Sequence, residues 1–194
     1  MTLPDLWPPR QPDLEPADFG WFEPCAIELL SEFVTPDTKC IVELGSWLGK
    51  STRWFLDTAP SAQVIAIDHW KGSVEHRRFG GGFLDLLWPR FLYNCWDYRD
   101  RLIPVKADTQ EGMEAAYGEG IKPDLVYVDA NHATKAVIQD ITTAMWLWPD
   151  AQITGDDWIW KPGAHFPVRQ AVKHVATKRG LTIHVVGNTW ALLR

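Results

Sequence analysis

The sequence predicts an α/β fold: a doubly wound sheet of seven strands, mostly parallel, with a C-terminal antiparallel hairpin and helices on both faces. Short apolar runs typical of buried strands alternate along the chain with segments of helical periodicity. The last two strand-like runs follow each other with only a tight turn between them. Repeated strand-helix units imply a parallel sheet, because right-handed crossovers return each strand to the same direction.

The predicted elements follow one another from residue 22. Apolar residues at helical spacing predict a first helix over 22–34, which Pro36 and Asp37 end. Strands are expected at about 40–45, 64–68, 101–108, 123–129, 151–157, 181–187 and 189–194. Helices are expected between them at about 50–59, 84–96, 110–117, 133–147 and 167–178. Functional residues should then lie at the carboxyl ends of the parallel strands.

The chain length predicts a single domain over residues 21–194 after a Pro-rich N-terminal arm over residues 1–20. A chain of 194 residues suffices for one well-filled core. Five prolines in the first 16 residues exclude a regular helix and predict an extended arm on the surface or on a partner. The alternative is a flexible tail.

Composition and charge restrict the classes of partner. The formal charge of −6 argues against a nucleic-acid partner, which usually meets a basic stripe, and favours a small neutral or cationic ligand. The three cysteines lack the close spacing of a zinc or redox site, so reduced thiols are expected. Neither a signal peptide nor a membrane span is expected, so we predict a cytoplasmic protein without a membrane partner.

The stretch ELGSWLGKS, residues 43–51, is one residue shorter than a phosphate loop. Gly45 and Gly49 enclose three residues, whereas a phosphate loop needs four between its first glycine and its Gly-Lys-Ser to surround a β-phosphate. This disfavours a kinase or ATPase. Asp68 follows Gly49 by 19 residues, the spacing of an acid that binds ribose hydroxyls. Together these features favour a nucleoside ligand; the alternative for Asp68 is a turn cap.

The motifs ELGSWLGKST, IDHWKGS, PDLVYVDANH and ITGDDW, in this order, resemble those of class I S-adenosylmethionine-dependent methyltransferases, which have a Rossmann-like fold. The sequence is most similar to small methyltransferases that resemble macrocin-type sugar O-methyltransferases and their metal-dependent relatives. The resemblance extends from about residue 22 to residue 194 and includes the closing strand pair. It implies that S-adenosylmethionine is the cofactor.

The resemblance also implies how the cofactor is held. Its methionine part and ribose would lie along Glu43, Gly45 and Gly49, and Asp68 would hold the ribose hydroxyls. His69 or Trp70 would flank the adenine, and Asp108 would reach its amino group with Thr109 beside it. The implied cofactor-binding residues are Glu43, Gly45, Ser46, Gly49, Asp68, His69, Trp70, Asp108, Thr109 and Asp129.

Asp129, Asp156 and Asp157 end the next two strands, so three carboxylates should converge beside the reactive methyl group. Such oxygen ligands suit Mg²⁺ or another divalent cation such as Ca²⁺ or Mn²⁺. In the metal-dependent relatives the matching acids hold an ion that lowers the pKa of the acceptor's hydroxyls. The alternative is that these acids only cap turns and order their loops.

His132 is the second candidate catalytic residue, with Asp129. The relatives often carry a second acid where this sequence has Asn131, so His132 gains importance as a general base. The alternative is a structural histidine. Gly80, Gly81 and Gly82 suggest a hinge for a lid, or an ordinary loop. Trp158, Trp160 and His165 are candidates for the wall of an acceptor pocket, the alternative being that they only pack beneath it.

The leading hypothesis is therefore O-methylation of a small hydroxylated acceptor, such as a sugar or a natural product. The alternatives are a hydroxylase-like metal enzyme on the same fold and a non-catalytic binding module whose cofactor space is blocked. A nicotinamide oxidoreductase is disfavoured because the third glycine of its fingerprint is missing. The sequence leaves open whether the protein forms a homo-oligomer.

Overall fold

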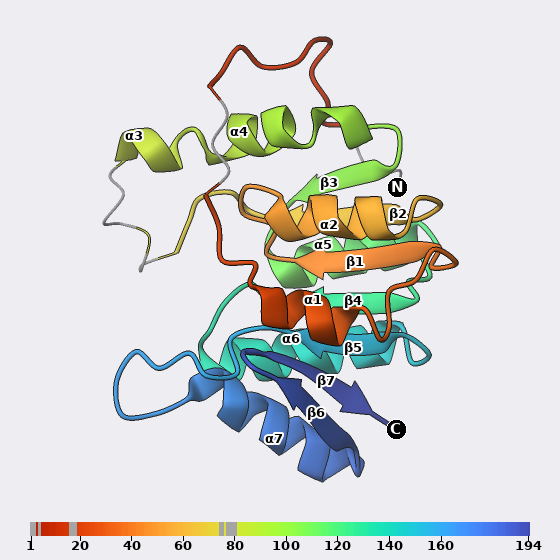
Figure 1. Cartoon of the computed structure of the whole chain (residues 1–194), viewed down its shortest axis with the longest axis vertical. Helices are drawn as coiled ribbons and strands as arrows, with labels where there is room; N and C mark the ends of the chain where they lie inside the picture. The colour runs from red at the N-terminus through yellow and green to blue at the C-terminus, as the bar shows by residue number, and fades with distance from the viewer. Residues whose placement is uncertain (1–2, 4, 16–18, 74–75, 77–80) are drawn as a thin grey trace.

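The seven strands form one sheet in the order β3-β2-β1-β4-β5-β7-β6 (Figure 1). The computed structural model describes residues 3, 5–15, 19–73, 76 and 81–194. Its strands are β1 (Cys40–Leu44), β2 (Gln63–Asp68), β3 (Leu102–Lys106), β4 (Leu125–Val128), β5 (Gln152–Gly155), β6 (Thr182–Val186) and β7 (Thr189–Leu193). Its helices are α1 (Pro24–Leu30), α2 (Lys50–Thr58), α3 (Gly81–Leu84), α4 (Leu87–Asn94), η2 (Trp96–Tyr98), α5 (Thr109–Gly118), α6 (Thr134–Leu147) and α7 (Pro167–Arg179).

Alternating side chains of the central strands pack into two hydrophobic clusters, one on each face of the sheet. Val42 and Leu44 of β1 belong to the cluster that includes residues of α5, α6 and α7. Ile41 of the same strand belongs to the cluster of α1, α2 and α4. Because both faces of a parallel strand are covered, its apolar run is nearly continuous. The predicted doubly wound sheet with helices on both faces is confirmed (Figure 1).

The C-terminal hairpin makes the only antiparallel pairings in the described sheet. β7 pairs antiparallel with both β5 and β6, whereas β1 to β5 pair parallel with one another. The pair Val186 and Thr189 leaves Gly187 and Asn188 as a two-residue turn. Gly187 has a φ of 58°, a conformation that suits glycine. The predicted hairpin is thereby confirmed.

Two predicted helices have different bounds in the structure. The helix expected over 22–34 is α1, which begins at Pro24 and ends at Leu30. The helix expected over 84–96 is divided into α3, α4 and η2. Pro89 lies in the first turn of α4, where a helix needs no amide donor. A continuous helix would instead require the amide hydrogen that Pro89 lacks.

Described residues of the predicted arm lie against the domain without forming a helix or strand. Trp7 donates its Nε1–H to the carbonyl of Leu102 at 3.1 Å and meets the ring of Trp96 edge-on at 5.9 Å. The division at residue 20 stays a prediction. Gly80 lies outside the described residues, while Gly81 and Gly82 begin α3, so the hinge also stays a prediction. None of the described helices combines the length and apolar character that a membrane crossing requires.

Candidate functional site

A cavity of about 930 Å³ opens at the carboxyl ends of the parallel strands. The loops after β1 to β5 line it, together with residues just before α1. β1 lies between β2 and β4, so chain connections run in opposite directions from this point of the sheet. Such a switch point is where open α/β sheets bind ligands. The cavity therefore occupies the position at which the sequence places its motifs.

The loop after β1 is shaped by glycines in left-handed conformations. Gly45 has a φ of 88°, and a Cβ atom there would lie 2.1 Å from the carbonyl oxygen of Asp129. Gly49 has a φ of 81°, and its Cβ would lie 2.3 Å from Cys95 Sγ. Gly45 and Ser46 line the cavity, whereas Gly49 packs behind it. The glycines thus allow the loop to approach β4 on one side and α4 on the other.

Asp68, at the end of β2, connects the loop after β1 with the loop after β2 through hydrogen bonds. It also lines the cavity. Its Oδ2 accepts a hydrogen bond from Trp47 N at 3.0 Å, and its Oδ1 accepts one from Trp70 N at 2.7 Å. Burial raises the pKa of Asp68, although both hydrogen bonds oppose that change. His69 lines the cavity as well. Contact between Asp68 and ribose hydroxyls remains a prediction.

Trp70 and Glu43 are placed away from the cavity lining. Trp70 is 4% exposed and donates its Nε1–H to the carbonyl of Trp47 at 2.9 Å. Glu43 is fully buried and accepts hydrogen bonds from the hydroxyls of Ser51 and Thr52 at the start of α2. Burial raises the pKa of Glu43, and the hydrogen bonds limit the increase. Through these hydrogen bonds both residues stabilise the conformation of the loop between β1 and α2.

Asp108 is exposed at the start of α5 and lines the cavity, with no capping hydrogen bond from its side chain. Beside it, Thr109 donates its hydroxyl to Asp140 Oδ1 at 2.6 Å, and Gln110 Nε2 donates to the same oxygen at 2.7 Å. Burial raises the pKa of Asp140 to about 6. Sequence reasoning missed Asp140 because an acid within an amphipathic helix usually faces solvent.

Asp129, His132 and Asp157 form a compact group on the cavity wall. One potential ligand atom from each lies within 4.8 Å of the others. His132 Nε2 lies 2.7 Å from Asp157 Oδ2. Burial, followed by the neighbouring carboxylates of Asp157 and Asp156, raises the pKa of Asp129 well above its ordinary value. Burial and these like charges therefore favour the neutral form of Asp129 over its charged form.

Asp156 lines the cavity, but residues of β7 in the C-terminal hairpin donate hydrogen bonds to it. It is 4% exposed, and its Oδ1 accepts a hydrogen bond from the Thr189 hydroxyl at 2.9 Å. Trp190 Nε1 donates to its backbone carbonyl at 2.8 Å. Burial raises the pKa of Asp156 to about 6. The structure thus groups His132, in place of Asp156, with the other two predicted metal ligands.

The group fits a divalent ion in spacing and donor type. Two carboxylates and one imidazole within 4.8 Å would each supply one ligand. This nitrogen-containing set suits Mn²⁺, Fe²⁺ or Zn²⁺ better than Mg²⁺ or Ca²⁺, which favour oxygen ligands alone. The same residues also form an ion-free network, because His132 and Asp157 pair directly. The geometry is compatible with either a metal centre or a general base.

Aromatic side chains surround the mouth of the cavity. The Trp21 ring stacks on His76 at 5.5 Å with an interplanar angle of 13°, and Trp47 lies 4.1 Å from the same imidazole. The Trp160 ring lies 4.5 Å from that of His132. All five rings line the cavity, whereas the candidates Trp158 and His165 do not. Trp21 was missed because nothing in its spacing relates it to the distant motifs.

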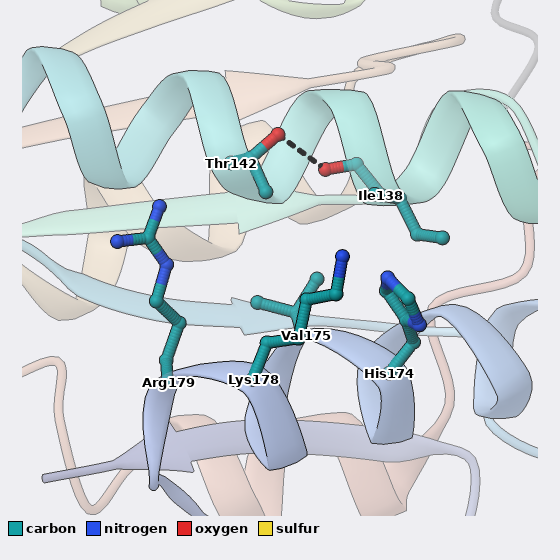
Figure 2. A pocket seen from close by; sticks show the side chains of 6 residues that line it. All are labelled: Ile138, Thr142, His174, Val175, Lys178 and Arg179. Atoms are coloured by element: carbon teal, nitrogen blue, oxygen red, sulfur yellow. Dashed lines mark hydrogen bonds between the residues drawn. The ribbon is translucent and has the colours of Figure 1, made fainter.

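A second cavity, of about 360 Å³, lies between α6 and α7 (Figure 2). His174, Lys178 and Arg179 of α7 extend toward α6, where the Thr142 hydroxyl donates to the carbonyl of Ile138 at 2.7 Å. Lys178 and Arg179 occupy the last turn of α7, where cations complement the negative end of the helix dipole. Their position at the end of α7 therefore explains Lys178 and Arg179, and no ligand in this cavity has to be assumed.

A protein-family model described as a methyltransferase domain matches residues 42–158. No curated protein matches the chain in sequence. Among solved structures, an O-methyltransferase from Bacillus cereus in complex with SAH is 15% identical, with a TM-score of 0.63 over 89% of this chain and 82% of the other. TomG, an O-methyltransferase from Streptomyces achromogenes involved in tomaymycin synthesis, in complex with SAM, is 16% identical, with a TM-score of 0.61 over 87% and 78%.

The fibrillarin pre-rRNA processing protein of Methanococcus jannaschii is similar over a smaller part of its length. It is 17% identical, with a TM-score of 0.54, and the match covers 82% of this chain and 66% of that protein. At these identities the three structures support the shared fold alone.

Proposed function

We propose that this chain, which belongs to the family of methyltransferase domains matched over residues 42–158, transfers a methyl group from S-adenosylmethionine to a hydroxyl of a small acceptor. The observation that supports this most strongly is the convergence of Asp68, Asp108 and the group of Asp129, His132 and Asp157 on one cavity. In this proposal Asp68 and Asp108 would bind the nucleoside, and the group around Asp129 would form the reactive end of the same cavity. TomG and the Bacillus cereus enzyme, which bind SAM and SAH, support the choice of cofactor.

The residues of the reactive end are suited to remove the proton from an acceptor hydroxyl. When bound, S-adenosylmethionine supplies an electrophilic methyl group, and the electron pair of the broken C–S bond stays on sulfur. Asp157 holds the His132 ring through Nε2 at 2.7 Å and would stabilise the imidazolium formed when the ring takes the proton. Asp129 lies beside this pair, and its raised pKa means that it gives up its own proton less readily than an ordinary aspartate.

A divalent ion is the alternative activator of the hydroxyl. Asp129, His132 and Asp157 would hold it, and its charge would lower the pKa of the acceptor oxygen. A bound ion and an imidazole that takes up a proton exclude each other at His132, because the metal needs the nitrogen lone pair. The effect of a chelator therefore distinguishes the two mechanisms.

The mouth of the cavity suggests an acceptor with an apolar face beside its hydroxyl. Trp21 is 46% exposed and Ile159 is 54% exposed, and both line the cavity. Large apolar side chains exposed around a pocket usually mark a binding surface. The described residues leave this cavity open, which argues against a non-catalytic binding module with blocked cofactor space.

The first test is calorimetric titration of the protein with S-adenosylmethionine and, separately, with ATP. We expect saturable binding of S-adenosylmethionine alone, weakened about tenfold or more in Asp108→Ala, which would lose a hydrogen bond to the adenine amino group. Asp108 is a suitable position because its side chain caps no amide. Asp150→Ala, at an exposed acid outside the cavity, is the matched control. Binding of ATP alone would contradict the proposal.

Transfer itself is tested with radiolabelled S-adenosylmethionine and a panel of hydroxylated sugars and ring compounds. Activity that survives a chelator but is lost in His132→Gln supports the general base. Activity that the chelator removes and Mn²⁺ restores supports the metal centre. If the cofactor binds but no hydroxyl compound is methylated, transfer to oxygen is the part of the proposal that fails.

A further inference from the structure

The cavity is strongly acidic and contains a single strong cation among its described lining residues. Its carboxylates are Glu23, Asp68, Asp108, Asp129, Asp140, Asp156 and Asp157. Lys50 is the only lysine or arginine in that described lining. The proposed cofactor has two positive groups, a sulfonium and an ammonium, and one negative group, the carboxylate of its amino-acid end. A cavity with many acids and one lysine matches this charge pattern.

The Lys50 ammonium is incompletely satisfied in the described structure. Its one hydrogen-bond partner is the carbonyl oxygen of Gly20, at the long distance of 3.4 Å. An ammonium has three donors and forms its strongest hydrogen bonds with charged acceptors. The neutral Gly20 carbonyl leaves most of this capacity unused. A carboxylate beside Lys50 would supply the charged acceptor that the described residues do not.

The surroundings of Lys50 also favour an anion. Lys50 is the first residue of the nine-residue helix α2, and the N-cap residue Gly49 makes no side-chain hydrogen bond to its first amides. Helix N-termini attract negative charge because these amides lack intrahelical partners. Ser46, which is 2% exposed, lines the cavity in the same loop. Its hydroxyl lies near enough to lower the pKa of Glu43, yet falls outside hydrogen-bond geometry and has no other partner in the described chain.

We propose that Lys50 binds the carboxylate of the cofactor's amino-acid end, assisted by the Ser46 hydroxyl and the first amides of α2. This inference rests on the proposed function, because it assigns one end of the same ligand. It also gives the lysine of the shortened phosphate-loop motif a role without phosphate. Lys50 thereby acts as a binding residue that selects for a nucleoside with an attached amino acid.

The test compares two nucleoside thioethers that differ at this end. S-adenosylhomocysteine has the amino-acid group, and 5′-methylthioadenosine lacks it. We expect Lys50→Met to weaken S-adenosylhomocysteine about tenfold to a hundredfold, as for a lost charged hydrogen bond. Affinity for 5′-methylthioadenosine should stay within about twofold, because the pair is absent there. Calorimetry measures the affinities, with competition titrations for the weaker ligand.

Two further variants separate charge from structural damage. Lys50→Arg keeps the positive charge and should restore most of the affinity for S-adenosylhomocysteine. Lys71→Met removes an exposed lysine outside the described lining and should leave both affinities unchanged. If Lys50→Met lowers the affinity for both nucleosides equally, or for neither, the role of Lys50 is wrong while the proposed function still stands. If the unmodified protein binds neither nucleoside, the proposed function fails and the inference fails with it.

Discussion

Trp47 and Trp70 adopt left-handed backbone conformations, with φ of 48° and 49°. Such conformations are costly for a bulky side chain. Both backbone amides donate to the carboxylate of Asp68, which offsets that cost by fixing the two loops together. The motif spacing predicts that Asp68 binds a ribose. The spacing does not predict that Asp68 also binds the amides of Trp47 and Trp70, because it contains no information on backbone torsions.

Gly45 has neither the backbone conformation nor the space for a side chain. A Gly45→Ala chain would combine a left-handed φ with a contact of 2.1 Å between the new methyl group and the Asp129 carbonyl. We expect the free energy of unfolding to fall by about 2–5 kcal/mol, the sum of the torsional and overpacking costs. Chemical denaturation measures the change. Gly118→Ala is the control, because Gly118 has open space around it and a smaller effect there is expected.

α5 and α6 are joined by polar contacts that periodicity alone does not indicate. Asp140 of α6 accepts hydrogen bonds from Thr109 and Gln110, and Thr143 donates its hydroxyl to Gln110 Oε1 at 2.6 Å. Strand positions, helix order and the hairpin could be predicted, because each depends on local pattern or connection rules. Partners between helices depend on helix rotation and packing, which a single sequence leaves open.

This polar contact predicts a pH dependence of stability. Burial raises the pKa of Asp140 from 3.8 to about 6, so the folded chain holds this proton more tightly than the unfolded chain. The contribution of protonated Asp140 to the free energy of unfolding is fully present below about pH 4 and is lost as the pH rises through about 6. Relative to Asp140→Asn, the native protein should lose about 2–3 kcal/mol between about pH 4 and pH 7.

Denaturation of both proteins across this pH range measures that difference. Asparagine keeps an oxygen for the Thr109 and Gln110 donors but does not titrate. The other buried acids are present in both chains and cancel in the comparison. A difference in stability that does not vary with pH would contradict the raised pKa.

For the molecule as a whole, the cavity walls come from inside and outside the segment that the family model matches. Residues 42–158 contribute Asp68, Asp108 and the group around Asp129. Trp21, from before that segment, and Trp160, from after it, belong to the walls of the mouth. The first set was predictable because its residues lie at or shortly after the carboxyl ends of parallel strands. The second depends on contacts between distant parts of the chain, so motif spacing contains no signal for it.

We therefore predict that Trp21 serves the acceptor rather than the cofactor. Trp21→Ala should lower kcat/KM for the acceptor about threefold to tenfold, the range expected for loss of one aromatic contact. The affinity for S-adenosylmethionine should stay within about twofold. Trp146→Ala is the matched control, because Trp146 is 76% exposed on α6 and lies outside the described lining. Weakened cofactor binding in Trp21→Ala alone would assign the ring to the cofactor instead.

The position of β1 between β2 and β4 has a consequence for how the fold holds together. Ile41 pairs with Val64 on one side and with Leu125, far along the chain, on the other. The β1–β4 pairing is therefore a seam between two halves of the sheet, and residues from both halves line the cavity. A ligand there touches both halves at once, so its binding energy opposes separation at the seam. Occupancy would thus increase the cooperativity of unfolding.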